Sequence, residues 1–134
     1  MTGDRPVGLI GAGWATVDLD RAAIELAPLL ADGAAFEEAA GCVSLGARCR
    51  IGRANSLAPA PTIVLLEPAT EGRLAATLAR HGESWCATWM LDQAPWATTV
   101  CDPRRGPLGE ERLVAGDPAS GPHRLLVRPI TIRP

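Results

Sequence analysis

The sequence predicts an α+β domain, built from strands with two helices between them. Segments in which apolar and polar residues alternate are typical of strands. Two other segments carry apolar residues at every third or fourth position, as helices do. The chain has 134 residues, the size of one domain, and 47% of them are hydrophobic. We therefore expect a single domain over residues 1–134.

The first half of the chain is expected to contain a strand, a helix and two further strands. Residues 7–17 are apolar and glycine-rich and suit a strand, and Asp18 can cap the helix that follows. Pro28 lies late in that helix and should kink or shorten it. Residues 43–51 alternate between apolar and polar side chains, and the apolar run 62–67 between prolines predicts a buried strand.

The second half is expected to begin with a helix over residues 70–82 and to continue as strands. Thr70 can cap this helix, Leu74 and Leu78 lie one turn apart, and Gly82 ends it. Later strands are expected over residues 85–91, 111–115 and 124–132, the last of them broken or forced to an edge by Pro129.

Composition argues against several classes of partner. A net charge of −2 gives no basic stripe for nucleic acid and no polybasic patch for a membrane surface. The apolar run 7–17 is too short to span a bilayer, and the aspartates after it argue against a secretory leader. Four irregularly spaced cysteines are interpreted as free thiols in a reducing cytoplasm: Cys42, Cys49, Cys86 and Cys101.

A glycine motif near the start, Gly8-Leu9-Ile10-Gly11-Ala12-Gly13, is similar to the phosphate-binding turn of a dinucleotide-binding unit. In such a unit a third glycine follows and a helix begins within the motif. Here the third position is Thr16, and helix-capping residues begin only at Asp18. We therefore expect the glycines to lie in a strand, where they allow another group to approach closely.

Neither histidine has the sequence surroundings of a catalytic group. His81 ends a helix, where its charge opposes the helix dipole, and His123 lies in a Gly-Pro-His turn that is expected on the surface. Two acidic pairs are expected to be solvated rather than to act as general acid and base: Glu37-Glu38 and Glu110-Glu111.

Two segments carry a likeness to known proteins. Residues 14–22, Trp-Ala-Thr-Val-Asp-Leu-Asp-Arg-Ala, are similar to a first strand that runs into a D-L-(D/E) helix cap. Leu65-Leu66-Glu67-Pro68, then a short helix, then His81-Gly82-Glu83-Ser84 are similar to a linker between two modules. Both segments resemble the vicinal oxygen chelate superfamily, which includes glyoxalase I, methylmalonyl-CoA epimerase, extradiol dioxygenases and bleomycin-resistance proteins.

This resemblance implies two βαβββ modules whose mixed sheet curls around a cavity. Module one would cover about residues 7–68, the linker helix residues 70–82, and module two about residues 84–133. No helix is evident between residues 91 and 97, so the second module is expected to be truncated.

The resemblance also indicates where a metal would lie. Metal-dependent members hold a divalent ion with four side chains, one from each of four strands. The matching positions in this sequence are Gly11, Val64, Ala87 and Val127, which offer no ligand atom. Of their neighbours only Cys86 is a plausible ligand, and one ligand does not make a site. We therefore expect no metal ion and no other cofactor.

The same positions predict a ligand site. Trp85 and Trp89 lie four residues apart in a strand, which would place both indoles on the face of Ala87, where they could stack on a planar ligand. Arg48 and Arg50 share the polar face of their strand, so they lie either on the surface or at the rim of the cavity, where they could hold an anion. The predicted set is Gly13, Val64, Trp85, Ala87, Trp89 and Val127, with Arg48 and Arg50 at the rim.

The leading hypothesis is therefore metal-independent binding of a small apolar or aromatic molecule, as bleomycin-resistance proteins perform within the family. One alternative is a lyase or isomerase of the superfamily that acts without the usual metal. A third is an NAD(P)-binding oxidoreductase fragment. No nucleic-acid or membrane partner is expected, and a homodimer remains open.

Overall fold

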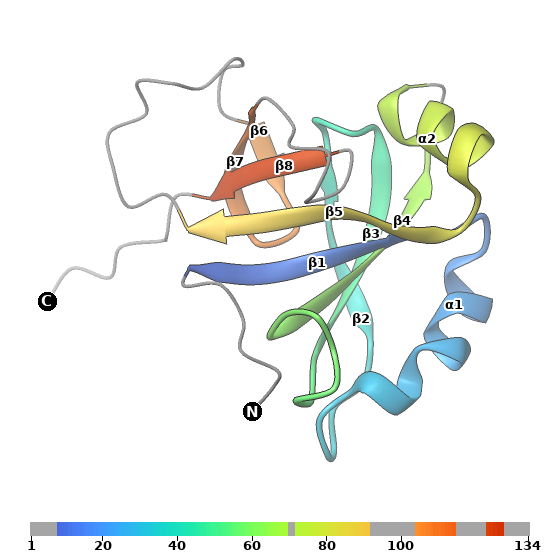
Figure 1. Cartoon of the computed structure of the whole chain (residues 1–134), viewed down its shortest axis with the longest axis vertical. Coiled ribbons are helices and arrows are strands. Elements are labelled where there is room, and N and C mark those ends of the chain that lie inside the picture. Colours follow the sequence, from blue (N-terminus) through green and yellow to red (C-terminus); the bar gives the residue numbers. More distant parts are fainter. Residues whose placement is uncertain (1–7, 70–71, 92–103, 115–122, 128–134) are drawn as a thin grey trace, which may run out of the picture.

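The computed structural model describes residues 8–69, 72–91, 104–114 and 123–127, and these form one mixed sheet of eight strands with two helices (Figure 1). In chain order the elements are β1 (Leu9–Ala15), α1 (Leu19–Glu25), the 3-10 turn η1 (Ala27–Leu29), β2 (Glu37–Cys42), β3 (Ala47–Arg53), β4 (Thr62–Pro68), α2 (Arg73–His81), β5 (Ser84–Leu91), β6 (Arg104–Gly106), β7 (Gly109–Val114) and β8 (His123–Val127).

The sheet consists of two halves with the same strand order. The full order is β2-β3-β4-β1-β5-β8-β7-β6, so each half places its first strand at the centre of the sheet. That first strand pairs in parallel with the last strand of its own half: β1 with β4, and β5 with β8. The two halves join through the antiparallel pair of β1 and β5. The predicted α+β fold with a curled mixed sheet is confirmed.

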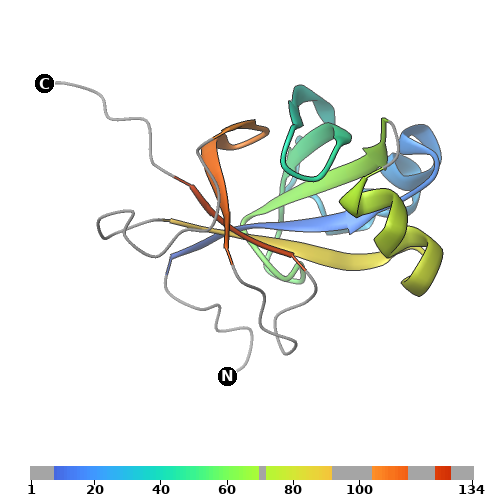
Figure 2. The same ribbon diagram turned by 90° about the horizontal axis from the view of Figure 1, so that it is seen from above.

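The two edges of the sheet approach each other and nearly close it. The backbone N–H of Val43, after β2, donates to the carbonyl oxygen of Arg105 in β6, with an N···O distance of 3.4 Å. Figure 2 shows the β6–β7 hairpin (orange) standing beside the β2–β3 turn (teal). Helix α2 packs Leu74 and Leu78 against the core inside the roll, so it covers one end of the roll.

Apolar side chains form one cluster inside the roll and a second cluster outside it, under α1. The inner cluster takes side chains from seven strands and α2; its larger buried members are Leu45, Val64, Leu66, Leu74, Trp89, Leu113, Leu125 and Val127. The outer cluster packs α1 on the central strands through Leu19, Ala22, Ala58, Ile63 and Leu65. The sheet is therefore buried on both faces at its centre, which explains the continuous apolar run of β4.

Helix α1 has the cap and the break that the sequence predicted. Asp18 Oδ1 accepts a hydrogen bond from the backbone N–H of Arg21, with an N···O distance of 3.2 Å. The α-helix ends at Glu25, and Pro28 lies in the following 3-10 turn. At the end of α2, Gly82 has a φ of 75°, a conformation that favours glycine.

Three strands differ from the expectation: β3, β2 and the short strand β6 (Arg104–Gly106), which was not predicted. The alternating segment 43–51 was predicted as one strand, but β3 begins only at Ala47, because residues 43–46 turn the chain with Gly46 at a φ of 70°. Strand β2 was not predicted. It is an edge strand with most of its side chains exposed, so it lacks the apolar alternation by which a strand is recognised.

Several expectations concern residues outside the described part of the chain. They include the cap at Thr70, the thiol of Cys101, the truncation of module two within residues 92–103, and the strand beyond Val127. In the part that the structure describes, no helix is long and apolar enough to cross a membrane.

Candidate functional site

Five of the predicted ligand residues meet on the inner surface of the roll. Gly13 of β1 is the register partner of Val64 in β4 and of Ala87 in β5. Trp89 and Val127 belong to the same inner cluster, and none of the four side chains is more than 3% exposed. The structure therefore brings these residues together as part of a packed interior.

The glycines of β1 make room for the indole of Trp89. A Cβ atom on Gly13 would lie 2.8 Å from Cζ3 of Trp89 and 2.8 Å from Cδ1 of Leu66, and one on Gly11 would lie 2.6 Å from Cδ1 of Leu108. Both glycines lie inside β1, so the prediction that they allow close approach within a strand is confirmed.

Trp85 lies on the opposite face of β5 from Trp89, so the prediction that both indoles share one face is wrong. Trp14 pairs with Trp85 while Gly13 pairs with Ala87, which leaves Cys86 as an extra residue in β5. Such a β-bulge reverses the alternation on its far side. The Trp85 ring packs edge-on against Trp14, with ring centroids 5.2 Å apart, and Trp14 belongs to the outer cluster.

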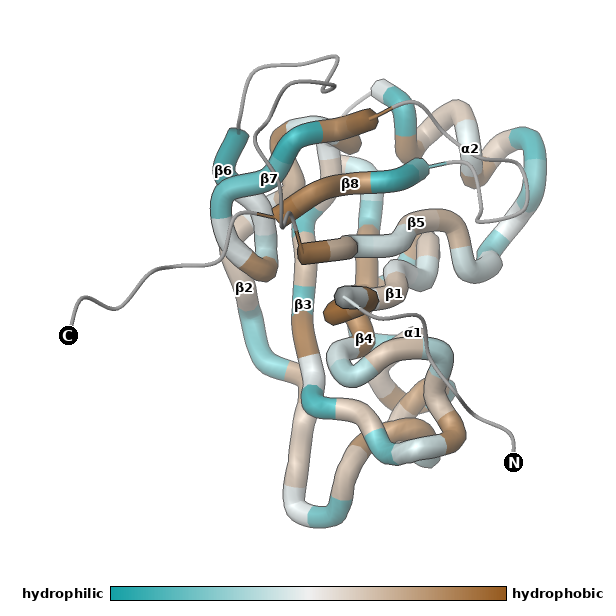
Figure 3. Tube along the Cα trace, turned by 60° about the vertical axis from the view of Figure 1, so that its left-hand side comes forward, coloured by the Kyte–Doolittle hydropathy of each residue, from teal (hydrophilic) through white to brown (hydrophobic). Residues whose placement is uncertain are grey.

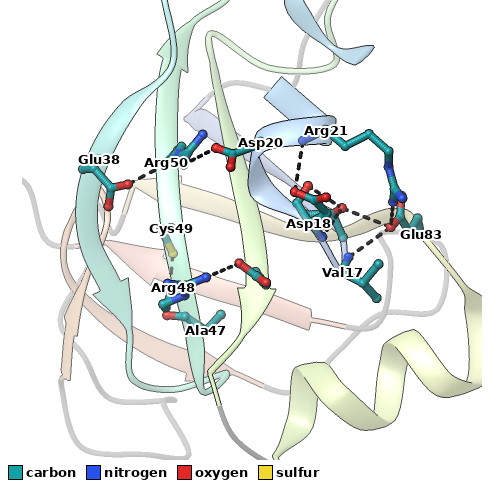
Figure 4. Close-up of polar contacts among 12 residues, drawn as sticks. Val17, Asp18, Asp20, Arg21, Glu38, Ala47, Arg48, Cys49, Arg50 and Glu83 are labelled. Carbon is teal, nitrogen blue, oxygen red and sulfur yellow. Dashed lines mark hydrogen bonds and ion pairs between the residues drawn. The ribbon is translucent and has the colours of Figure 1, made fainter. Parts of the chain in front are cut away.

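The two arginines of β3 are paired with carboxylates (Figure 4). Arg50 Nη2 lies 2.7 Å from Asp20 Oδ1, and its Nε lies 3.3 Å from Glu38 Oε2. Arg48 is paired with Glu67 of β4. These pairs join β3 to β2, β4 and α1, so the charges of both arginines are already matched within the chain.

A carboxyl group is buried inside the roll. Glu111 is 0% exposed, and it accepts hydrogen bonds from Trp89 Nε1 at 2.7 Å and from Cys42 Sγ at 2.9 Å. Burial raises the pKa of Glu111 to about 6, and the two donors oppose that rise. The expectation that the Glu110-Glu111 pair is solvated is therefore wrong for Glu111, because strand alternation turns it inward.

The surroundings of Glu111 seal it from solvent. Burial, together with the nearby carboxylate, raises the pKa of Cys42, so the thiol keeps its proton and acts as the donor. Gly106 of β6 lies directly against the carboxyl group, and a Cβ atom there would overlap it. The group is therefore held by two side-chain donors and covered by a glycine.

The four positions matched to metal ligands do not fit a metal ion. The four positions matched to metal ligands are Gly11, Val64, Ala87 and Val127, and all four lie in the adjacent strands β4, β1, β5 and β8. Their side chains supply no donor atoms. Among the described residues, no group of three or more His, Cys, Asp or Glu side chains could hold a metal ion.

A pocket of about 270 Å³ lies where α2 covers the end of the roll. Arg73, Thr77 and Arg80 follow one another at helical spacing along one face of α2, and His123, the first residue of β8, lies beneath them. Hydrophilic residues on α2 are visible in Figure 3. The described residues that line it are Arg73, Ala76, Thr77, Arg80, His81 and His123. We call this the α2 pocket.

His123 is buried in the α2 pocket, so its predicted place on the surface is wrong. Thr77 Oγ1 donates to the carbonyl oxygen of Arg73 at 3.0 Å and lies 2.7 Å from His123 Nε2. Thr77 Oγ1 and His123 Nε2 therefore form a buried hydrogen bond whose direction depends on the tautomer of the ring. Burial lowers the pKa of His123, and the positive charge of Arg73 lowers it further.

The cations of the α2 pocket have no acidic partner among the described residues. The salt bridges found among the described residues all involve Arg21, Arg48 or Arg50, and none of them involves a residue of the α2 pocket. Uncompensated guanidinium groups that converge on a pocket are typical of sites for carboxylate or phosphate. The sequence shows the spacing of Arg73, Thr77 and Arg80, but only the path of β8 places His123 beneath them.

The chain is similar to solved structures of low sequence identity. No protein-family model matches it, and no curated protein sequence matches it. Methylmalonyl-CoA epimerase from Mycobacterium tuberculosis superposes with a TM-score of 0.72 at 20% identity, over 98% of this chain and 93% of the epimerase. A Streptomyces coelicolor epimerase variant in complex with 2-nitronate-propionyl-CoA gives 0.70 at 20% identity, over 94% and 97%. A hypothetical protein from Bacillus halodurans C-125 gives 0.66 at 14%, over 94% and 96%.

These similarities establish the fold. The epimerases are members of the vicinal oxygen chelate superfamily, so the fold that the sequence resemblance implied is confirmed. At these identities the similarity does not transfer an activity.

Proposed function

We propose that this chain is a small-molecule binding protein that works without a metal ion and holds an anionic ligand in the α2 pocket. The observation that carries the proposal is the convergence of Arg73, Arg80 and His123 on a pocket of about 270 Å³, with no acidic partner among the described residues. A carboxylate or phosphate group would supply the missing negative charge.

The ligand residues predicted from the sequence indicate how the proposed ligand would extend from the α2 pocket into the roll. His123 is the register partner of Ala87, which is itself the partner of Gly13. An apolar part of the ligand would extend from the α2 pocket along this row towards Val64, with Val127 four residues further along β8. It would have to displace the indole of Trp89, which covers Gly13 in this structure.

The structural neighbours support this class of ligand. One of them is a methylmalonyl-CoA epimerase in complex with methylmalonyl-CoA and NH4+, which superposes with a TM-score of 0.69 at 21% identity. Such a thioester combines an acyl group with a strongly anionic carrier, so a protein of this fold accommodates both kinds of group.

A second candidate is an isomerase that acts without a metal, and Glu111 favours it. A carboxyl group with a pKa of about 6 is suited to take up and release a proton near neutral pH. In this conformation the group is fully buried, so a substrate would reach it only if β6 or Trp89 moved. If wild type turns over methylmalonyl-CoA and Glu111→Gln binds it without turning it over, the isomerase hypothesis would be favoured over ligand binding alone.

Titration calorimetry with methylmalonyl-CoA tests the main proposal. We expect one ligand per chain, unchanged by EDTA, and affinity reduced about tenfold in Arg80→Gln. Arg53→Gln is the matched control, because Arg53 is an exposed arginine at the end of β3 and does not line the α2 pocket. Equal affinity of wild type and Arg80→Gln for methylmalonyl-CoA would show that the ligand does not bind in the α2 pocket. A tight divalent ion at one per chain, found by elemental analysis, would remove the metal-free mechanism.

A further inference from the structure

A second pocket lies beside the α2 pocket, where the two edges of the sheet meet. It measures about 220 Å³ and is lined by Val43, Ser44, Arg73, Arg104 and Leu113. Arg73 lines both pockets, so its side chain is shared between them. We call the second one the seam pocket, since it lies at the contact between the β2–β3 turn and β6.

The seam pocket contains an unsatisfied donor. The hydroxyl oxygen of Ser44 is buried and has no hydrogen-bond partner among the described residues. A buried hydroxyl group without a partner costs stability, so most such groups in native proteins are satisfied by protein, water or ligand. The charged side chains among the described residues that line the pocket are two arginines, which can only donate. A ligand oxygen that accepts from Ser44 would complete the arrangement.

Cationic side chains continue past the seam pocket. Arg104 also lines a third pocket of about 400 Å³, together with Arg105, Gly106, Gly109 and Glu110. The hydrophilic β6 strand is visible in Figure 3. Arg73 thus lines the first two pockets and Arg104 lines the last two. Among the described residues that line the three pockets, Glu110 is the one acidic residue.

We infer that the anion of the proposed function is a ligand with at least two linked phosphoryl groups, bound with one in the α2 pocket and the next at Ser44 between Arg73 and Arg104. A single carboxylate or phosphate would satisfy the α2 pocket alone. Two linked phosphoryl groups would use the shared Arg73 and would give the Ser44 hydroxyl its acceptor. This inference rests on the proposed function and names the chemical class of its ligand.

Calorimetric titration of the full chain with pyrophosphate and, separately, with orthophosphate tests the inference. We expect pyrophosphate to bind at least tenfold more tightly than orthophosphate, because it engages both pockets. Arg104→Gln should weaken pyrophosphate binding about tenfold and leave orthophosphate binding unchanged. Ser44→Ala should weaken pyrophosphate binding by a smaller factor without lowering the thermal midpoint, because the hydroxyl makes no hydrogen bond with any described residue of the unliganded chain. Arg53→Gln is the control for loss of positive charge alone.

The outcomes separate the inference from the proposed function. If Arg104→Gln and Ser44→Ala both bind pyrophosphate as wild type does, while Arg80→Gln weakens it, the α2 pocket stands and the two-phosphoryl inference is overturned. If Arg80→Gln changes neither pyrophosphate nor orthophosphate binding, the proposed function is overturned together with the inference that rests on it. Equal affinity of wild type for the two anions also overturns the inference.

Discussion

The carboxyl group buried inside the rolled sheet has hydrogen-bond partners from the chain, whereas the arginines at its α2 end lack a described acidic partner. Inside, Glu111 is fully buried, and both of its hydrogen-bond donors come from the chain itself, from Trp89 and Cys42. At the α2 end, Arg73 and Arg80 line an open pocket and have no acidic partner among the described residues. Inside the roll, the buried carboxyl group of Glu111 is therefore satisfied by hydrogen bonds from the chain. At the α2 end, the positive charges of the two arginines are not balanced by any described acidic residue.

The contrast separates the residues that stabilise the fold from those available to a ligand. Changes inside the roll should alter the free energy of unfolding, because they disturb close packing and buried hydrogen bonds. Removing a cation from the α2 end should leave that free energy nearly unchanged and alter anion binding. Five substitutions test this separation.

The largest effect on stability is expected for Gly106→Ala. The new methyl group would overlap the carboxyl group of Glu111, which can move aside only by breaking its hydrogen bonds with Trp89 and Cys42. We expect the free energy of unfolding to fall by about 2–4 kcal/mol, measured by urea denaturation. Gly72→Ala is the matched control, since its Cβ atom would lie 3.7 Å from its nearest neighbour, an ordinary contact. Equal losses in the two variants would show that Glu111 is not held as described.

Glu111→Gln should change how stability depends on pH. The pKa of Glu111 is about 6 in the folded chain and 4.5 as an ordinary value, so the folded state binds the proton more tightly. Wild type should therefore lose about 2 kcal/mol of stability as pH rises from 4.5 through 6 and above, and the variant should not. His123, with a lowered pKa, acts in the opposite direction in both proteins, so it cancels in the difference between them. Parallel stability curves from pH 4 to 8 would contradict the raised pKa.

Thr77→Val tests the boundary between the two regions. The variant removes the hydroxyl group that shares a hydrogen bond with His123 Nε2 and leaves that ring nitrogen without its partner. We expect a loss of about 1–2 kcal/mol in the free energy of unfolding. Thr88→Val serves as the control, because Thr88 lies in β5 at a half-buried position where valine suits a strand. A loss no greater than that of the control would show that the Thr77–His123 contact does not stabilise the fold.

The smallest effects on stability are expected for the arginines. Arg50→Gln breaks two ion pairs whose carboxylate side chains are about 80% exposed, so the loss should be under about 1 kcal/mol. Arg80→Gln should change the free energy of unfolding by less than about 0.5 kcal/mol, while weakening the binding of methylmalonyl-CoA. Chemical denaturation and calorimetry on the same samples measure both quantities. A larger loss in the free energy of unfolding for Arg80→Gln than for Arg50→Gln would contradict the proposed difference between the arginines of β3 and those of the α2 pocket.

Local patterns were sufficient for the elements whose geometry depends on nearby residues. Asp18 caps α1, Pro28 ends it early, and Gly82 terminates α2, because each of these effects acts within a few residues of the chain. The glycines of β1 were interpreted correctly as positions of close approach, although the group that approaches, Trp89, lies 76 residues after Gly13 and could not be named in that role.

The candidate site depended on information that local patterns do not contain. Alternation placed Trp85 beside Trp89, but the bulge at Cys86 reversed the face, because a bulge follows from the pairing of β5 with β1. Glu111 was expected in solvent because a carboxyl group is rarely buried, and here donors from β2 and β5 satisfy it.

The sequence by itself determined the α+β class, the caps and breaks of the helices, and the resemblance that implied this fold, because these depend on neighbouring residues and on matched motifs. The tertiary structure decided which polar groups are paired. Arg48 and Arg50 meet carboxylates from α1, β2 and β4, whereas Arg73 and Arg80 share a pocket with His123. The physical reason is that charge pairing acts over a few ångströms of space, and only the folded sheet brings residues 12 to 50 positions apart within that distance.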